Sequence, residues 1–290
     1  LDRYRLLDGV LWQAGIDAID ADELAVRPLI KGTAYHLAES AWVKHRTIGG
    51  GEHVQDIGFF DGAHYAVGSG ADNRTEFEGG MIFRYLWRST NMADSFETVE
   101  RVVYTLGDTR WVHLLATAQN LYLFGYEYNF TTMRGVIKNA RYAGGSVTAL
   151  GTSDSLMRIF PSGTLPLSDG SGLVWGYDVT NATPVNQSWH VAPDGLATVM
   201  AELNGKTVVD VALEQTTSEI LYLVYKGDDA FSSPDSFEAA VLVAPLASPG
   251  DVHELIAFAT DDTPRSITFW RGSLFLGTGA GQILVAAGTP

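Results

Sequence analysis

The sequence predicts an all-β protein, a β-propeller built from four-stranded antiparallel blades, with six blades expected. Apolar and polar residues alternate over short runs, and Gly, Asn, Asp or Pro interrupt these runs every eight to twelve residues. That spacing is typical of short strands joined by turns. A hairpin pattern also recurs along the chain at steps of 47 to 57 residues, which is the period of a four-stranded blade.

Each copy of the repeat is an apolar strand, a tight polar turn and a second strand rich in apolar and aromatic residues. The clearest copies span 53–70, 111–127 and 265–281, and weaker copies span 4–17, 158–178 and 207–228. We assign the two strands of each hairpin as strands A and B of a blade. Strands C and D follow, for example in residues 79–89 and 97–106 of the second blade.

These assignments predict one domain over residues 1–290, with the last blade short of one strand. Either residues 1–5 supply an edge strand to that blade, or the natural chain continues past Pro290. A five-bladed ring, with the hairpin at 158–178 as an insertion, is the structural alternative. The six predicted blades cover residues 1–50, 51–107, 108–154, 155–205, 206–259 and 260–290.

Composition excludes several kinds of function. The formal charge of −15 argues against nucleic acid as a partner, because such partners require a basic surface. No apolar segment is long enough to span a bilayer, so no membrane insertion is expected. The chain contains no cysteine, which excludes disulfides and thiolate zinc sites.

The chain begins at Leu1 rather than Met, so a targeting segment could have been removed. Four glycosylation sequons support an extracellular setting: Asn73, Asn129, Asn181 and Asn186.

One segment of the second predicted blade carries a family resemblance. Ser89, Asn91, Ala93, Ser95 and Phe96 fit the pattern S-x-D-x-G-x-T-W with conservative replacements. This segment resembles the Asp box of the sialidase-like, or BNR-repeat, propellers. The resemblance implies a structural β-turn between strands C and D. It is a resemblance of fold, because propellers of this kind include hydrolases, lectins and scaffolds.

Cationic residues stand at the starts of five predicted A strands. In a propeller these strands line the central channel, so their starts converge on one mouth. Several guanidinium groups around one pore can bind a carboxylate, sulfate or phosphate through paired hydrogen bonds. Sialidases hold a sugar carboxylate with an arginine cluster, so the resemblance suggests an anionic glycan. In the alternative interpretation these residues pair with nearby aspartates. The candidate ligand-binding residues are His53, Arg110, Arg158, Lys206 and Arg265, with Tyr128 in a B-to-C loop as a stacking residue.

Hydrolysis of a glycan would also require two opposed carboxyl groups. Asp56 and Asp210 occupy equivalent positions in the segments HVQD and TVVD, so both are expected at a similar depth in the channel. Such a residue can equally bind neighbouring backbone groups and stabilise the ring. No catalytic residue is assigned firmly, and the candidates are Asp56, Asp210, Glu127 and Glu214.

An acidic cluster suggests a calcium site. Asp17, Asp20 and Asp22 are close enough in sequence for their oxygens to share one hard cation. Their spacing lacks the glycine and terminal glutamate of an EF-hand loop, so a solvated acidic loop is the favoured interpretation. No other cofactor is expected.

These observations favour a non-catalytic propeller for recognition or display at an extracellular, virion or cell surface. It would bind a glycan or a protein partner at one mouth of the ring. A sialidase-like glycoside hydrolase is the first alternative, and a structural subunit of a larger assembly is the second.

Overall fold

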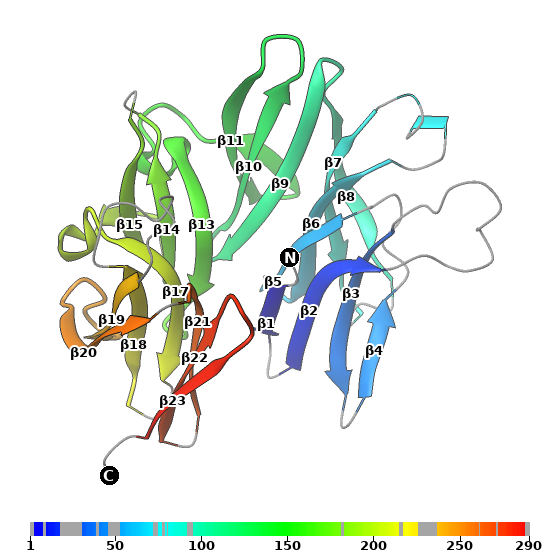
Figure 1. Ribbon diagram of the computed structural model, residues 1–290. Coiled ribbons are helices and arrows are strands. Elements are labelled where there is room, and N and C mark those ends of the chain that lie inside the picture. The colour runs from blue at the N-terminus through cyan, green and yellow to red at the C-terminus, as the bar shows by residue number, and fades with distance from the viewer. Residues whose placement is uncertain are drawn as a thin grey trace. The chain divides into compact units, whose positions relative to one another are not determined.

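In the computed structural model the chain forms six antiparallel sheets that follow one another in sequence (Figure 1). It divides into two compact units, Leu1–Ile159 and Phe160–Pro290, and each unit is described by itself. Within the described residues, no helix has the length and apolar character that a membrane span requires. The structure describes residues 3–7, 10–17, 31–38, 41–45, 53–71, 75–76, 79, 81–91, 95–180, 183–214, 217–225, 237–260, 262–270 and 272–287.

The first unit contains three four-stranded sheets. Each is a meander in which neighbouring strands in sequence pair with one another. The first sheet is β1 (Arg3–Leu7), β2 (Val10–Asp17), β3 (Lys31–Ala38) and β4 (Ala41–His45). The second is β5 (His53–Phe60), β6 (Ala63–Gly70), β7 (Phe83–Ser89) and β8 (Glu97–Val103). The third is β9 (Gly107–Ala116), β10 (Leu121–Asn129), β11 (Arg134–Ala143) and β12 (Ser146–Ala149), followed by the 3₁₀ helix η2 (Ser155–Arg158).

The second unit contains two four-stranded sheets and one sheet of three strands. The fourth sheet is β13 (Ile159–Pro166), β14 (Gly172–Asp178), β15 (Val185–Val191) and β16 (Ala197–Val199), and the 3₁₀ helix η3 (Ala201–Leu203) follows it. The fifth sheet is β17 (Thr207–Glu214), β18 (Glu219–Tyr225), β19 (Phe237–Pro245) and β20 (His253–Thr260). The sixth sheet is β21 (Pro264–Trp270), β22 (Ser273–Thr278) and β23 (Ile283–Ala287).

This topology confirms the predicted all-β class and the count of six sheets. The segment at 158–178 forms the first hairpin of a complete sheet, so it is not an insertion. Strand β1 pairs with β2 in the first sheet. It therefore does not complete the sixth sheet, contrary to one of the two options considered for the missing strand. The assignment of residues 1–290 to a single domain stays a prediction.

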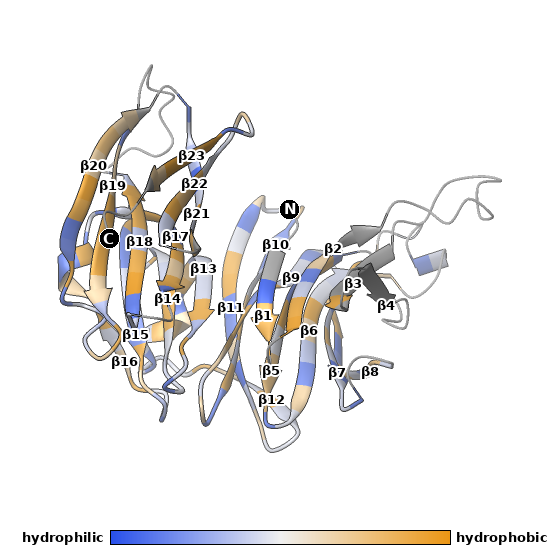
Figure 2. Cartoon of the chain, turned by 90° about the horizontal axis from the view of Figure 1, so that it is seen from below, coloured by the Kyte–Doolittle hydropathy of each residue, from blue (hydrophilic) through white to orange (hydrophobic). Residues whose placement is uncertain are grey.

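Both faces of the inner strands are buried. In β6, Tyr65 and Val67 pack in a core between the second and third sheets, whereas Ala66 packs in a core between the first and second. Since successive side chains of a strand point to opposite faces, a strand between two cores must be apolar at nearly every position. This explains why Figure 2 shows long hydrophobic segments in the inner strands.

Tight turns and close backbone contacts explain two kinds of glycine in the repeat. In the β5–β6 hairpin, Asp61 and Gly62 both have positive φ angles, 47° and 72°, as a two-residue type I′ turn requires. Gly68 and Gly125 lie opposite a β-bulge of the preceding strand. A Cβ atom at these glycines would overlap the carbonyl oxygens of His53 and Arg110, respectively. These two positions therefore accept no side chain.

The Asp-box-like segment forms the turn between β7 and β8, as the resemblance implied. Asn91 holds the turn through its amide group. Its Oδ1 accepts hydrogen bonds from Ser89 Oγ at 2.8 Å and from the Ser95 backbone N–H at 3.2 Å, and its Nδ2 donates to Ser95 Oγ. Phe96 packs against the core of the first and second sheets. Ala93 lies outside the described residues.

Candidate functional site

The first unit gathers charged side chains at the end where β5 and β9 begin and β10 ends. Arg110 is in β9, and its Nε donates a 2.6 Å hydrogen bond to Asp108 Oδ2. The Arg110 side chain is 30% exposed, whereas that of Asp108 is only 10% exposed. This contact fixes the guanidinium through Nε. Among the described residues, neither Nη group of Arg110 has a hydrogen-bond or ion-pair partner. Arg110 thus presents its two terminal N–H groups as a fork that suits an oxyanion.

His53, at the start of β5, and Tyr126, opposite Arg110 in β10, belong to the same electrostatic environment. Burial lowers the pKa of His53, and the positive charge of Arg110 lowers it further, while Asp108 opposes the change. Burial also raises the pKa of Tyr126, against the influence of Arg110. Neutral imidazole is therefore the favoured form of His53 at neutral pH. An anion bound at Arg110 would favour its protonation.

A second charged group, which the sequence analysis missed, joins the second and third sheets at this same end. Arg84 of β7 stacks on the indole of Trp111, with its Cζ 4.3 Å from the ring centroid. Its two Nη atoms lie 3.6 Å from carboxylate oxygens of Glu100 and Glu127. Glu127 also pairs with Lys138 Nζ at 3.1 Å. Arg84 therefore lies between two carboxylates from different sheets.

The sequence signal for Arg84 was an arginine between aromatic residues in the strand FRYLWRS. Such a residue needs a partner when the strand is buried. The register that supplies Glu127 from the neighbouring sheet could not be derived from that segment. Among the catalytic candidates, Glu127 is the one that the structure places beside cationic groups at this end of the first unit.

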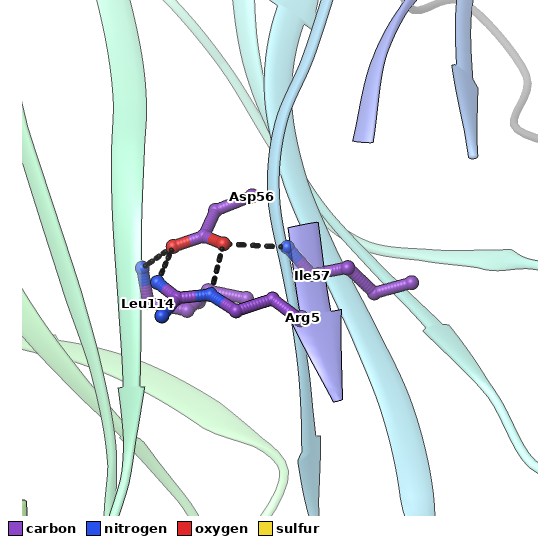
Figure 3. Close-up of polar contacts among 4 residues, drawn as sticks. All are labelled: Arg5, Asp56, Ile57 and Leu114. Atoms are coloured by element: carbon purple, nitrogen blue, oxygen red, sulfur yellow. Dashed lines mark hydrogen bonds and ion pairs between the residues drawn. The ribbon is translucent and has the colours of Figure 1, made fainter. Parts of the chain in front are cut away.

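Asp56 is enclosed and joins three strands (Figure 3). Its side chain is 0% exposed. Arg5 Nε and Nη2 donate to its two oxygens at 2.9 and 2.7 Å. The backbone N–H groups of Ile57 and Leu114 donate at 3.0 and 2.9 Å. Because Arg5, Asp56 and Leu114 lie in β1, β5 and β9, one carboxylate connects the first strands of three consecutive sheets.

Asp210 plays an equivalent part in the second unit. Both aspartates directly follow a β-bulge in the first strand of their sheet. Asp210 Oδ2 accepts the backbone N–H of Ile267, in the first strand of the next sheet, at 2.9 Å. The predicted equivalence of Asp56 and Asp210 is thus visible in their contacts. Those contacts match the structural alternative, in which a channel aspartate binds backbone groups of the next blade.

The other candidate residues are spread over both units. In the first unit, Arg158 is exposed at the end of η2, and the Tyr128 hydroxyl lies 3.7 Å from Met133 Sδ. In the second unit, Lys206 Nζ donates to the backbone oxygen of Glu202 at 2.6 Å. Arg265 is exposed. Hydrogen bonds from Thr278, Ala280 and Thr263 lower the pKa of Asp262, and the positive charge of Arg265 lowers it further, while desolvation opposes the change.

Glu214 does not share an end of its strand with the cationic residues. It is the last residue of β17, where it pairs with Glu219 across the hairpin, whereas Lys206 immediately precedes the start of that strand. The structure therefore does not bring Glu214 to the strand end at which the cations were predicted to converge.

The predicted calcium site falls on residues about which little can be stated. Asp20 and Asp22 lie outside the described residues, and of Asp17 only the backbone, at the end of β2, is described. Elsewhere in the described part of the chain, no group of three metal-ligating side chains occurs. The calcium site remains a prediction.

Comparison with known proteins identifies the fold and no family. No protein-family model matches the chain, and no curated protein matches it. Three similar solved structures are an acylaminoacyl peptidase of Pyrococcus horikoshii, a sialidase of Trypanosoma rangeli and the β-propeller domain of the Trilobed protease of Pyrococcus furiosus. Their sequence identities are 9%, 11% and 8%, and their TM-scores are 0.51, 0.49 and 0.48.

The matched regions cover 98%, 98% and 99% of this chain, and 44%, 53% and 80% of those proteins, respectively. The chain thus spans about half the length of the peptidase and of the sialidase. The chain has a β-propeller fold. The resemblance stated from the Asp-box-like turn is confirmed at this level, and each of the six sheets is one blade.

Proposed function

We propose that this propeller is a non-catalytic recognition module that binds an anionic glycan at the end of the first unit where β5 and β9 begin. The observation that carries the proposal is the state of Arg110. Asp108 holds its Nε, and the two Nη groups remain to donate to a ligand. A carboxylate or sulfate accepts such paired N–H donors in one plane.

Neighbouring groups support an anionic sugar as the ligand. His53 becomes a second cation when it is protonated. At the end of β10, the rings of Tyr128 and Phe130 meet edge to face, with centroids 5.8 Å apart. Phe130 is exposed, so this pair offers an apolar surface for the face of a sugar ring. A protein partner that presents a carboxylate would meet the same donors and is the alternative ligand.

The contacts of Asp56 support the absence of catalysis. A general acid or base must reach the substrate, and this carboxylate is fully enclosed by Arg5 and by two backbone N–H groups. Its role in this proposal is to hold the blades together.

A glycan array with purified protein tests the proposal. Arg110→Ala should abolish retention of anionic glycans. Arg110→Lys should weaken it at least about tenfold, because lysine keeps the charge but lacks the fork. Arg141→Ala is the matched control, because it removes one exposed arginine at the opposite end of the third blade. If the wild type retained no glycan on the array, or if Arg110→Ala bound anionic glycans as well as the wild type does, the proposal would be refuted.

The glycoside-hydrolase alternative rests on a different observation. Glu100 and Glu127 both lie 3.6 Å from Arg84, so two carboxylates from adjacent blades meet around one cation. Turnover of aryl glycosides by the wild type, lost in both Glu127→Gln and Glu100→Gln, would favour hydrolysis over recognition alone.

The extracellular or surface location is also part of the proposal, and the sequons support it. The side-chain amides of Asn129 and Asn186 donate hydrogen bonds to the hydroxyls of Tyr104 and Thr207, so a glycan there would displace a contact. Asn73 and Asn181 lie outside the described residues. Secretion from a eukaryotic cell, followed by a mass shift upon deglycosylation, would test which sequons are used.

A further inference from the structure

The sixth blade ends on a strand with an open edge. Within the described part of the chain, its order is β21, β22, β23, and no strand follows β23. Each of the other five blades has a fourth strand in that place. The outer edge of β23 (Ile283–Ala287) therefore corresponds to a position that is occupied everywhere else in the repeat.

Composition shows that β23 resembles a covered strand. Its sequence, ILVAA, closely matches AVLVA (240–244) within β19, the third strand of the fifth blade. In β19, Val241 is 0% exposed. In β23, Ile283 and Val285 are 70% and 58% exposed. Figure 2 shows β23 coloured largely as hydrophobic. The same kind of strand is thus buried in one blade and uncovered in another.

The backbone pairing shows which groups of β23 face outward. Thr278 N–H donates to the Gln282 carbonyl at 3.0 Å, so these two residues form a hydrogen-bonded pair with β22. In an antiparallel ladder such pairs alternate with non-hydrogen-bonded pairs. The N–H and C=O groups of Ile283, Val285 and Ala287 therefore point away from β22, toward the open edge.

The outer strands of the other blades are protected by charge or by shortness. β4, β8 and β20 contain charged or histidine side chains, and β12 and β16 have only four and three residues. Soluble proteins use these two means to prevent unwanted strand pairing. β23 has neither a charged residue nor, with five residues, the shortness of β16.

We propose that β23 accepts an extended segment of a partner polypeptide as an antiparallel fourth strand. Backbone hydrogen bonds would supply affinity, and alternating apolar side chains would supply specificity. The net charge of −15 favours a segment with basic flanks. The net charge also disfavours a second copy of this chain as the partner. Two acidic chains would have to meet over a five-residue strand, whereas stable protein pairs bury about 1,200 Å² or more. β23 belongs to the second unit, whereas Arg110 belongs to the first.

A synthetic probe can test the edge directly. The fluorescent peptide KKHELIAFATKK carries residues 253–260 of this chain, the strand that covers β19 in the fifth blade, between lysine pairs. The control peptide has proline in place of its isoleucine, which removes a backbone donor and disfavours the strand. We expect saturable binding of the first peptide, measured by fluorescence anisotropy, and binding at least about tenfold weaker for the second.

Two protein variants locate the binding. Val285→Pro removes an outward N–H without breaking the ladder to β22, and should weaken binding at least about tenfold. Val285→Thr keeps the N–H and the β-branch and should bind nearly as the wild type does. Circular dichroism of both variants controls for folding. Hydrogen exchange of the wild type, which needs no variant, should show new protection confined to residues 283–287 when the peptide is bound.

Three results would overturn the proposal. The first is absence of saturable binding by the peptide. The second is slow exchange of the Ile283, Val285 and Ala287 amides in the free protein, which would show that the edge is already covered. The third is a concentration-dependent dimer in sedimentation that Val285→Pro abolishes, which would identify a second copy as the occupant.

Discussion

Asp56 shows how one residue can determine the arrangement of three blades. Its carboxylate receives two bonds from Arg5 of the first blade and one from the Leu114 backbone of the third. A buried carboxylate is costly unless every oxygen is bonded, and here each is. The residue is therefore part of the framework, although its type and position would suit an acid or base.

Replacement of Asp56 tests this role. Asp56→Ala leaves the Arg5 guanidinium buried without its partner and should lower the free energy of unfolding by about 3–5 kcal/mol. Asp210 is half-buried, so Asp210→Ala should lower the free energy of unfolding by less. Urea unfolding of both variants measures the difference. Equal and small losses for the two variants would contradict the framework role of Asp56.

His53 gives the protein a pH-dependent stability. Burial and Arg110 lower its pKa in the folded state below the ordinary 6.5. The unfolded chain then binds the proton more readily, so the free energy of unfolding falls as the pH falls below about 6.5. The loss is complete below the folded pKa.

The thermal midpoint should thus decrease between pH 7 and pH 5, and His53→Gln should make this decrease shallower. Burial also lowers the pKa of His190, so His190→Gln is the comparison variant. An unchanged pH dependence in His53→Gln would show that the imidazole titrates alike in both states.

At the scale of the strand, the bulge and its facing glycine form a unit that the repeat preserves. The first strand contains a bulge in the second, third, fifth and sixth blades, close to its start in all of these but the third. In the second and third blades a glycine faces the bulge, because the backbone approaches too closely for a side chain. The bulge in turn directs the following residue, Asp56 or Asp210, toward the next blade.

Gly125→Ala should therefore be strongly destabilising. The new Cβ would overlap the Arg110 carbonyl and lie 2.8 Å from the Trp111 ring, and substitutions that force such overlap can cost more than about 4 kcal/mol. Gly151→Ala is the matched control, since its Cβ would meet only Ser153 Oγ at 4.0 Å. It should change stability by less than about 0.5 kcal/mol. Similar unfolding midpoints for the two variants in urea would contradict this account.

At the scale of the whole molecule, the net charge of −15 opposes the compact state. Like charges repel more strongly when they are brought together by folding, and salt screens them within about 10 Å at 0.1 M. The thermal midpoint should thus rise between 20 mM and 300 mM NaCl. Each kcal/mol gained corresponds to a few degrees, about 2–4 °C for a chain approaching this size.

The same increase in NaCl should weaken the binding of an anionic glycan at Arg110, because salt also screens the attraction between the anion and the guanidinium. Opposite responses of stability and binding to one salt series would separate the two effects. A midpoint that falls with salt would show that ion pairs such as Arg84 with Glu127 outweigh the general repulsion.

The sequence by itself determined the strands, the hairpins, the six repeats and the Asp-box-like turn. These features depend on alternation, turn glycines and local hydrogen bonds, all of which act over a few neighbouring residues. Even the equivalence of Asp56 and Asp210 followed from their position within the repeat.

Only the tertiary structure decided which charged groups meet. Asp56 bonds to residues 51 and 58 positions away, and Arg84 reaches Glu127 in the next blade. Such contacts depend on the register and the side-by-side placement of blades, which no local pattern encodes. The open edge of β23 belongs to both scales, because the repeat predicted a last blade short of one strand, while only the tertiary structure placed β1 in the first sheet and not beside β23.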